Sequence, residues 1–417
     1  MGFQQGLSGL NAASKNLDVI GHNIANSNTT GFKSSRADFA EMIASAIGSA
    51  SGQSSGIGVN VAAVSQQFRQ GSITSTGNNL DIAINGNGFF IVKQSDGSTA
   101  YTRAGNFGLD KEGNLKTVDN DNVMGYMVDP ATGKIQSGAT PVPLSFPTGQ
   151  PIPAKQTSKV NVELNLDSRA TLAAGDATAT PPVAATPRAT YGTSLNVYDT
   201  QGTAIPVNLY FEKDATGNTW NIFNSLDPAA GPIGVATFDA SGKLTGVTPG
   251  TGTSLNLSIN GGTANPNGLP AFNVELDFGG LTQFGTKFAV SSLKQDGYTS
   301  GALTGINVGR DGSIVASYSN GVTRTEGQMA LAAFTNTQGL GSIGNNKWVA
   351  TADSGPALNG SAQTGTFGSL QSGALEESNV DLTAELVNMM TAQRSYQANA
   401  QTIKTQDQVF STLVNLR

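Results

Sequence analysis

The chain has 417 residues, a formal net charge of −6 and charged side chains at only 12% of its positions, with 52 Gly and no Cys. The absence of Cys excludes disulfides, thiolate metal sites and Cys nucleophiles. The acidic balance, without any basic block, argues against a nucleic-acid-binding surface. A chain of this length is long enough for about two or three domains.

The first predicted element is a helix from Phe3 to about Asn26, because apolar and small residues recur there at a spacing of three and four. This N-terminal seam consists of Phe3, Leu7, Leu10, Ser14, Leu17, Gly21 and Ile24. The segment has no charge before Lys15 and no apolar core of the signal-peptide type, so we expect no cleavable secretory signal. The turn-forming residues at 26–31 end the helix.

The next segment, from Phe32 to about Gly71, is rich in Ser, Gly and Ala and has little periodicity. It predicts a connector that contains one short helical piece, "ADFAEMIASAI" at 37–47. Gly/Ser-rich composition also marks 352–374. We therefore expect 31–70 and 352–374 to form a flexible connector between the ends of the chain and its middle.

The middle of the chain is predicted to be all-β. "NNLDIAINGNGFFIVK" places two short β runs on either side of Asn85–Gly88, which is typical of a hairpin. "YTRAGNFGLDKEGNLKT" repeats the pattern with Lys111–Asn114 as the turn. Later runs alternate apolar and polar residues between Gly, Asn, Asp or Pro, which indicates short antiparallel strands. These runs are "KVNVELNL", "TSLNVYD", "IPVNLYFE", "NTWNIF", "AFNVELDF", "SIVASYSNG" and "MALAAF".

A Pro-rich segment at 139–156 interrupts the β region and is interpreted as a domain boundary, with the chain returning near Phe288–Tyr298. We therefore expect an inner β domain built from 71–145 and 288–351. An outer β domain, 146–287, would be inserted into it at a surface loop.

The last predicted element is a long helix that starts near Asn379 or Asp381, either of which is a suitable N-cap. Its C-terminal seam consists of Leu382, Leu386, Met389, Gln393, Tyr396, Ala400, Ile403, Asp407, Phe410 and Val414. Two arrangements are open: an antiparallel two-helix stalk within one molecule, or a polymer in which the apolar members of both seams also contact neighbouring copies. Broad apolar stripes beside amides and hydroxyls, rather than charges, favour the polymer. The terminal helical assembly domain would comprise 1–30 and 375–417.

No motif indicates an enzyme, a cofactor or a metal site. The only His, His22, is predicted to lie on the surface of the first helix. "GLGSIG" at 339–344 precedes a strand pattern rather than a helix, which favours a hairpin loop over a dinucleotide site. "VDNDNVMG" at 118–125 lacks the distal Glu of an EF-hand and is predicted to be a solvated turn.

The ends of the chain resemble a known family. "GLSGLNAASKNLDVIGHNIANSNTTGFKSSRADF" is similar to the N-terminal signature of flagellar rod and hook proteins, and "ALEESNVDLTAELVNMMTAQRSYQANAQTIKTQDQVFSTLVNLR" to their C-terminal signature. "GNNLDIAINGNGFFIV" and "YTRAGNFGLDKEGNL" resemble the β elements that follow. The long insertion between about 145 and 287 resembles flagellar hook proteins rather than the shorter distal rod proteins.

This resemblance implies an α+β multi-domain fold, in which the N- and C-terminal helices form a coiled-coil-like inner layer. Two mostly antiparallel all-β domains, one inserted in the other, would surround it. It implies a subunit that polymerises into the bacterial flagellar hook, the curved hollow universal joint that transmits torque from rod to filament. The implied location is the extracellular hook at the flagellar basal body, without nucleic-acid binding or membrane insertion.

The implied partners are further copies of the chain, the distal rod, the hook cap protein, the hook–filament junction protein and the flagellar type III export apparatus. Export through that apparatus would require no cleavable signal. Phe39 and Ile43 in "FAEMI" match the Phe-x-x-x-aliphatic pattern by which such substrates engage the export gate; a small amphipathic helix is the alternative interpretation. Without Cys, the covalent cross-linking of spirochaete hook proteins is excluded.

Three other functions are weighed against the hook subunit. A distal rod protein with an insertion would form straight rather than curved polymers. A β-rich surface-binding module would expose aromatic platforms, but Trp220 and Trp348, the only two Trp, both lie within strand patterns. A muramidase would need a pair of catalytic carboxylates that the sequence does not indicate.

Overall fold

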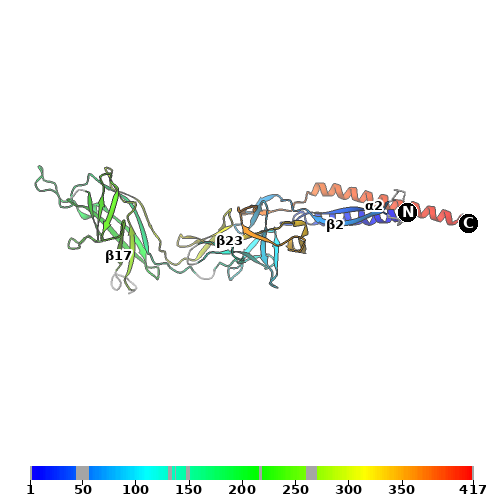
Figure 1. The fold of residues 1–417 in the computed structure, drawn as a ribbon, viewed down its shortest axis with the longest axis horizontal. Helices are drawn as coiled ribbons and strands as arrows, with labels where there is room; N and C mark the ends of the chain where they lie inside the picture. Colours follow the sequence, from blue (N-terminus) through cyan, green and yellow to red (C-terminus); the bar gives the residue numbers. More distant parts are fainter. Residues whose placement is uncertain are drawn as a thin grey trace. The chain divides into compact units, whose positions relative to one another are not determined.

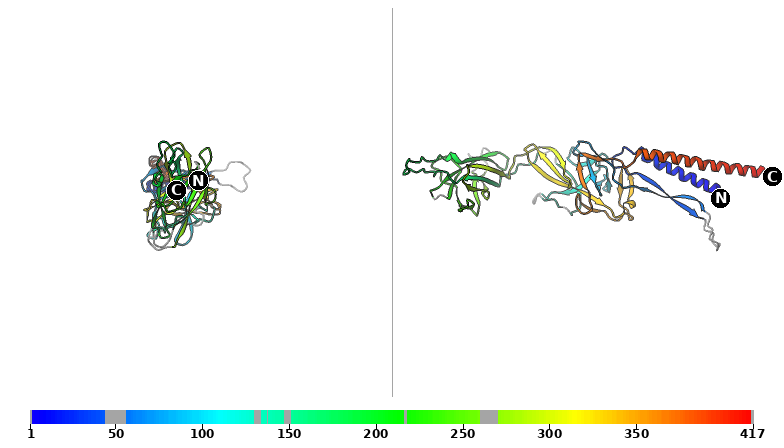
Figure 2. Two further views of the ribbon diagram at one scale, coloured as in Figure 1. Left: turned by 90° about the vertical axis from the view of Figure 1, so that its left-hand side faces the viewer. Right: turned by 90° about the horizontal axis from the view of Figure 1, so that it is seen from above.

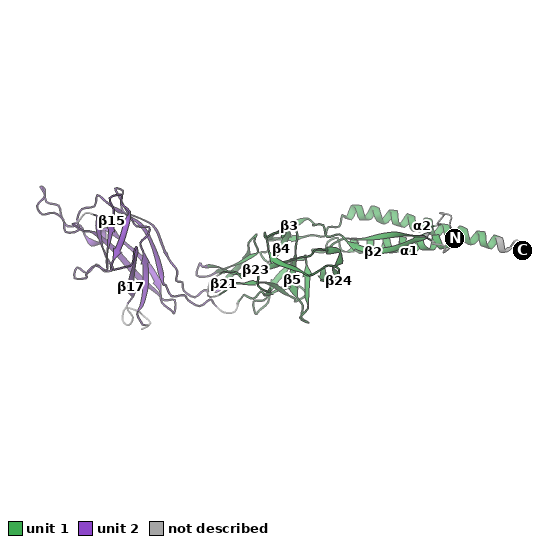
Figure 3. Ribbon diagram, in the orientation of Figure 1, with its two compact units in different colours: residues 1–149, 304–317, 323–417 green, residues 150–303, 318–322 purple. Residues whose placement is uncertain are grey.

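The computed structural model describes residues 2–43, 56–129, 134–136, 138–146, 151–215, 218–259 and 270–415 (Figure 1). A helix lies at each end of the chain, and a mostly antiparallel, β-rich body lies between them in sequence. The chain forms two compact units (Figure 3). The first unit comprises 1–149, 304–317 and 323–417, and the second comprises 150–303 and 318–322.

Both predicted helices are confirmed: α1 spans Gly2–Ala25 and α2 spans Leu382–Asn415. Asp381 caps α2, because its Oδ1 accepts hydrogen bonds from the backbone N–H groups of Thr383 (2.9 Å) and Ala384 (3.1 Å). Among the described residues, no helix is both long enough and apolar enough to cross a membrane.

The segment after α1 forms a long antiparallel hairpin of β1 (Ser35–Ile43) and β2 (Gly56–Gln66). The predicted helical piece at 37–47 is therefore wrong over 37–43, and 44–47 lie outside the described residues. Tertiary pairing outweighs the weak local helix preference. The side chain of Asp38 reinforces the pairing, because it accepts a hydrogen bond from Ser65 Oγ at 2.6 Å across the two strands. Strands β1 and β2 therefore make up most of the described part of the predicted connector segment 31–70.

The β body of the first unit is built around one large sheet with the strand path β21-β22-β23-β9-β5-β6-β25-β24. Two further two-stranded sheets, β27-β4 and β28-β3, belong to the same body. The strands of the whole body are β3 (Ile73–Ser75), β4 (Ile82–Asn85), β5 (Phe89–Lys93), β6 (Thr99–Thr102), β7 (Phe107–Leu109), β8 (Leu115–Thr117), β9 (Asn122–Met127), β10 (Val142–Pro143), β21 (Leu303–Val308), β22 (Ser313–Tyr318), β23 (Thr323–Ala333), β24 (Gly341–Gly344), β25 (Lys347–Val349), β26 (Leu358–Ser361), β27 (Ser369–Ser372) and β28 (Ala374–Glu376). Phe89, Tyr101 and Trp348 lie in one of its buried clusters.

The expected hairpin around Asn85–Gly88 is wrong, although both of its strands exist. β4 pairs with β27, whereas β5 pairs with β6, β9 and β23. The turn therefore sends two adjacent strands into different sheets, and the pairing partners come from far along the chain. The hairpin with its turn at Lys111–Asn114 is confirmed as β7–β8, and Gly113 adopts a φ of 86° there.

The second unit contains, within the described residues, two five-stranded sheets that share one apolar core. Its strands are β11 (Lys159–Asp167), β12 (Gly192–Tyr198), β13 (Ala204–Lys213), β14 (Thr219–Phe223), β15 (Gly234–Phe238), β16 (Leu244–Thr248), β17 (Ser254–Ile259), β18 (Phe272–Asp277), β19 (Thr282–Phe284) and β20 (Ala289–Gln295). One sheet is the meander β12–β16. The other is not wholly antiparallel, because β11 runs parallel to β18 and β19.

The second unit extends further along the chain than the expected return near Phe288–Tyr298. β20 pairs with β11, and the isolated bridges Lys155↔Tyr298 and Ile152↔Gly301 follow. The boundary therefore lies at Leu303. Strand β20 belongs to the second unit because it pairs with β11. The composition of a segment does not reveal which strand it will pair with.

Asp296 joins the two chain segments where they enter and leave the second unit. Its carboxylate accepts hydrogen bonds from the backbone N–H groups of Ser158 (2.8 Å) and Lys159 (2.9 Å), and it lies 3.1 Å from Lys155 Nζ. Partial burial raises the pKa of Asp296, but the hydrogen bonds from Lys159 and Ser158 outweigh this and hold the pKa at about 2. The ionised form is therefore the one that the fold stabilises.

We expect Asp296→Asn to lower the free energy of unfolding at pH 7 by about 1–2 kcal/mol, a value discounted for solvent screening. Because the folded-state pKa lies below the ordinary 3.8, this contribution is present above that pH and is lost as the pH falls towards 2. Urea denaturation followed by circular dichroism should show the difference between parent and variant shrink as the pH falls from 4 towards 2. A difference that is as large at pH 2 as at pH 7 would contradict this assignment.

Candidate functional site

The two terminal helices pack side by side and antiparallel, as Figure 2 shows. Gly6 of α1 faces Ile403 of α2, since a Cβ on Gly6 would lie 3.1 Å from Ile403 Cγ1. At the other end of the pair, Asn23 Nδ2 donates to Glu385 Oε1 at 3.1 Å. The absence of a side chain at Gly6 lets the two backbones approach closely there.

The face of α1 that packs inward lies beside the predicted seam rather than on it. Its most buried residues are Gly6, Ala12, Ala13, Ile20 and Asn23. These residues recur with the same spacing of three and four as the residues of the predicted seam. Most of them come one position before a seam residue in the sequence, so the buried face lies next to the seam around the helix. The pattern therefore identified the helix correctly but did not identify which stripe its partner helix covers.

The predicted seam residues remain largely uncovered in the single chain. The exposed ones are Phe3, Leu7, Leu382, Leu386, Tyr396 and Phe410. Those partly buried are Leu10, Leu17, Ile24, Met389, Ala400 and Ile403, and the side chain of Val414 lies outside the described part. Val387, Met390 and Val409 add further exposed apolar surface on α2. The helix pair thus leaves broad apolar stripes that no other described part of the chain covers.

We expect Gly6→Val to loosen the helix pair by about 1–3 kcal/mol, because the added methyl groups would meet Ile403. Gly21→Ala is the matched control in the same helix. No atom lies within 4 Å of a Cβ at Gly21, so this change should stabilise α1 by about 0.5–1 kcal/mol. Hydrogen exchange of the α1 amides measures the stability of the helix in each variant. Equal protection of these amides in the Gly6→Val and Gly21→Ala variants would contradict the close contact at Gly6.

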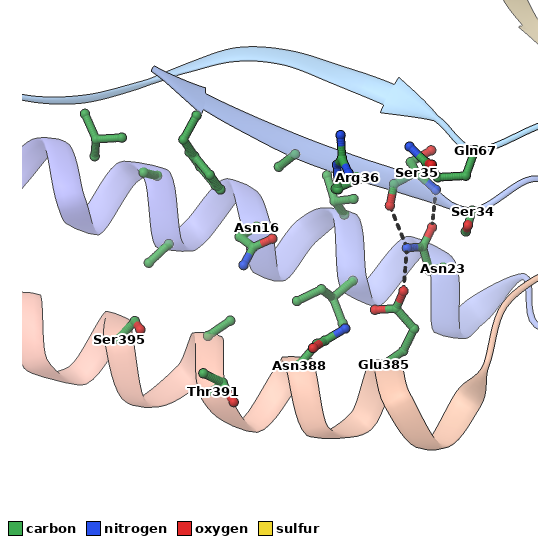
Figure 4. A pocket seen from close by; sticks show the side chains of 18 of the residues that line it. Asn16, Asn23, Ser34, Ser35, Arg36, Gln67, Glu385, Asn388, Thr391 and Ser395 are labelled. Atoms are coloured by element: carbon green, nitrogen blue, oxygen red, sulfur yellow. Dashed lines mark hydrogen bonds between the residues drawn. The ribbon is translucent and has the colours of Figure 1, made fainter. Parts of the chain in front are cut away.

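The β1–β2 hairpin is attached along α1. Gln5 Nε2 donates to the carbonyl of Gly56 at 2.7 Å, and Asn23 exchanges two 2.8 Å hydrogen bonds with the backbone of Ser35. Between α1, α2 and the hairpin runs an open groove of about 910 Å³ (Figure 4). Small and polar side chains line most of it, Asn23 and Glu385 among them.

A buried ion triad lies where the two ends of the chain meet the β body. Lys33 Nζ contacts Glu376 Oε1 at 2.5 Å, and Arg103 Nη1 contacts Glu376 Oε2 at 3.2 Å. The side chains of Lys33 and Glu376 are fully buried. Lys33 also donates to the carbonyl of Arg69 at 2.8 Å, and the N–H of Gly71 donates to Glu376 at 3.0 Å.

The triad places two buried cations against one buried carboxylate. Burial lowers the pKa of Lys33, and the charge and hydrogen bond of Glu376 oppose that shift. Burial likewise lowers the pKa of Arg103, again opposed by Glu376. Glu376 is therefore the residue on which both buried cations depend.

Two further contacts hold the same junction. Gly31 adopts a φ of 71°, and a Cβ there would lie 2.6 Å from Ala104 N, so only glycine fits. Asn379, the other predicted cap of α2, instead bridges the residues next to the ends of β1 and β2. Its Oδ1 accepts a hydrogen bond from Ser34 N at 2.7 Å and its Nδ2 donates to Gln67 O at 2.6 Å. The exit of α1 and the entrance to α2 are thus fastened to the body together.

Sequence reasoning missed these polar residues. Lys33, Arg103 and Glu376 are far apart in sequence, and none interrupts a periodic pattern in a way that signals burial. A fully buried Lys or Glu is rare, so their pairing emerges only when the fold brings the three segments together.

The turn at 118–125, which was compared with calcium-binding loops, has a structural role. The turn at 118–125 is not wholly solvated, because Asp121 is buried and forms an ion pair with Lys347, which also contacts Asp119 at 2.8 Å. Burial lowers the pKa of Lys347, but Asp119 and Asp121 outweigh it and raise the pKa above its usual value. The described residues hold no group of three or more His, Asp or Glu suited to a metal.

The remaining predicted residues lie as follows. The "GLGSIG" run is not a hairpin loop: Gly341–Gly344 form strand β24, and Asn345 and Asn346 make the turn to β25. No helix follows, so no pyrophosphate site arises there. His22 is exposed on α1, with its ring 5.5 Å from that of Phe32. Phe39 is exposed on β1, and Ile43 is the last residue of that strand.

Four family models match the chain. "Flagella basal body rod protein" matches 3–33, and "Flagellar hook protein FlgE/F/G D1 domain" matches 83–165. "Flagellar basal body protein FlaE D2 domain" matches 165–298, and "Flagellar basal body rod FlgEFG protein C-terminal" matches 371–416. The matches thus cover both terminal helices and both β regions.

Curated relatives match over the whole chain. The flagellar hook protein FlgE of Salmonella typhimurium is 43% identical and that of Escherichia coli 44% identical, each with all of both chains covered. The flagellar hook protein FlgE of Treponema pallidum is 34% identical over 99% of this chain and 98% of its own. Among solved structures, the Helicobacter pylori flagellar hook protein FlgE2 matches with a TM-score of 0.52 at 16% identity, covering 73% of this chain and all of that one.

Proposed function

The chain belongs to the flagellar hook protein FlgE family, and from that membership we propose that its copies polymerise through their terminal helices into the flagellar hook. This polymer is the curved hollow joint that transmits torque from rod to filament. The function is structural, and no catalytic step is part of it.

The observation that carries this proposal is the uncovered apolar surface of the helix pair. Leu386 and Met390 are 46% and 52% exposed although α1 packs along the same helix. Soluble monomers rarely leave such a continuous stripe in water, and a stripe of this kind marks a surface that associates. In a polymer, the apolar stripe of each copy would be covered by the apolar helices of its neighbours.

The proposal extends to the arrangement of the parts. The terminal helices would form the inner, coiled-coil-like layer of the hook, and the two β units would correspond to an inner domain and an outer domain inserted in it. The ion triad at Glu376 supports this view, because it fixes where each helix leaves the body.

The partners follow from the family. We expect contacts with the distal rod, the hook cap protein and the hook–filament junction protein, and export without a cleavable signal through the flagellar type III apparatus to the cell exterior. Phe39, exposed on β1, and Ile43 are the candidate contacts with the export gate.

Electron microscopy of purified protein left to polymerise tests the function. Curved, hollow tubes are expected. Straight tubes would favour the distal rod-type alternative, and no polymer at any concentration would refute assembly through the helices. A surface-binding module is disfavoured because Trp220 and Trp348 are 0% and 2% exposed and offer no aromatic platform.

A further inference from the structure

The segment between β11 and β12 of the second unit is of low complexity. Residues 170–190 read "ATLAAGDATATPPVAATPRAT", and Asp176 and Arg188 are the only charged residues among them. Thr hydroxyls in such Pro-containing, uncharged stretches are of the kind that carry O-linked sugars in mucin-like stalks. Which of the hydroxyls an enzyme can reach depends on how the fold holds the segment.

The fold holds the segment as an arm with a fixed base and an open tip. Asp176 and Val183 exchange two backbone hydrogen bonds, of 2.9 and 2.8 Å, which tie the two sides of the arm together. Residues 177–182 lie between these two positions, outside the strands and helices. All of them except Ala179 are exposed. We call residues 177–182 the arm tip.

Two Thr-Pro pairs lie in the segment, and their hydroxyls differ in accessibility. Thr186, before Pro187, is partly buried, and its Oγ1 lies 2.5 Å from Thr171 Oγ1, so this hydroxyl already has a partner. Thr180, before Pro181, is exposed in the arm tip, and its hydroxyl has no hydrogen-bond partner among the described residues. Thr180 therefore offers the free acceptor hydroxyl.

The other two Thr-Pro pairs of the sequence lie in or next to paired strands. Thr248 is the last residue of β16 and pairs with Val235 of β15. Thr140 lies two residues before Val142, which pairs with Gly125 of β9. A transferase binds the backbone on both sides of its acceptor residue, and the backbone groups of a paired strand are already used. The arm tip leaves its backbone open on both sides of Thr180.

The charges around the arm tip favour a neutral group over a phosphate. Asp176 Oδ1 accepts hydrogen bonds from the N–H of Thr178 at 2.9 Å and from its hydroxyl at 2.7 Å. These bonds hold the pKa of Asp176 below its ordinary value, so a negative charge lies at the start of the tip. A phosphate nearby would be repelled by it. Arg188, the cation of the segment, is already paired with Glu212 at 2.6 Å.

We propose that Thr180 is the acceptor of an O-linked sugar, which a glycosyltransferase of the producing cell transfers from a nucleotide sugar. Thr180 Oγ1 attacks the anomeric carbon, and the bond from that carbon to the nucleoside diphosphate breaks. The electron pair of that bond leaves with the diphosphate, and the hydroxyl proton passes to a base of the transferase. The sugar hydrates an arm tip that has no charged side chain of its own.

Mass spectrometry of the protein purified from the bacterium that makes it tests this modification. Trypsin cleaves after Arg169 and Arg188, with no Lys or Arg between them, so the arm is released as one peptide. The peptide should be heavier than its sequence by one or more sugar residues, and electron-transfer fragmentation should locate the added mass on Thr180. Thr180→Val should abolish the added mass. Thr186→Val, the matched control in the same peptide, should retain it.

The opposite results are equally definite. A peptide without added mass, or one with a phosphate instead of a sugar, would overturn the proposal. A sugar on Thr186 rather than Thr180 would show that the free hydroxyl of the arm tip does not select the site. The same peptide from protein made by cell-free translation should carry no added mass, and a sugar found there would overturn transfer by an enzyme of the producing cell.

Discussion

Replacing Glu376 by glutamine is expected to lower the free energy of unfolding of the first unit by about 3–5 kcal/mol. Glutamine keeps the shape of the side chain but removes the only carboxylate that contacts Lys33 and Arg103 within the described part of the chain. Two cations would then stay buried without a counter-charge. Urea denaturation followed by circular dichroism measures the loss.

The neighbouring residue provides a matched control. Glu377 is exposed and forms no ion pair among the described residues, so Glu377→Gln should change the stability by less than about 0.5 kcal/mol. Adding Lys33→Met to Glu376→Gln should restore part of the loss, because one uncompensated cation is removed. Equal stability of the two Gln variants would show that the triad does not hold the junction.

Leu386→Asp is expected to abolish polymerisation while leaving the monomer folded. Leu386 is 46% exposed in the single chain, so the charge stays in water there. In the polymer, the carboxylate would have to enter an apolar contact without a partner, at a cost of several kcal/mol for each subunit. Sedimentation of the polymer, with circular dichroism as a check of folding, measures the effect.

Two comparisons sharpen this test. Gln397→Glu, exposed on the same helix and outside the predicted seam, should polymerise like the parent. Ile403→Asp should fail for a second reason, because Ile403 packs against Gly6 of its own chain and the charge would also disturb the helix pair. If Leu386→Asp polymerises at the parent concentration, the exposed stripe is not a subunit contact.

The sequence by itself determined the kind and position of most elements. Helix α2 was predictable because a long stretch without Gly or Pro keeps a spacing of three and four from Leu382 onward. The β7–β8 hairpin was predictable because Gly113 supplies the positive φ of its turn. In both cases the element is specified by residues that are close in sequence, so it can be predicted without knowledge of any tertiary contact.

Only the tertiary structure decided which surfaces meet. A strand replaces the expected helix at 37–43 because β2 pairs with it, and β4 leaves its sequence neighbour β5 for β27, which returns from near the end of the body. Local patterns state that a strand or a helix forms, but its partner depends on which distant segment offers matching backbone groups or apolar surface.

The same limit applies to the site. The periodicity of α1 marked an apolar stripe through Phe3 and Leu7, whereas the residues that face α2 include Gly6 and Gly9, on a neighbouring face of the helix. Burial on a helix follows close approach as much as hydrophobicity, so small residues can take the inner face and leave the larger ones outside. Lys33 and Glu376 acquire their roles only because two ends of the chain, more than 300 residues apart, meet at one buried point.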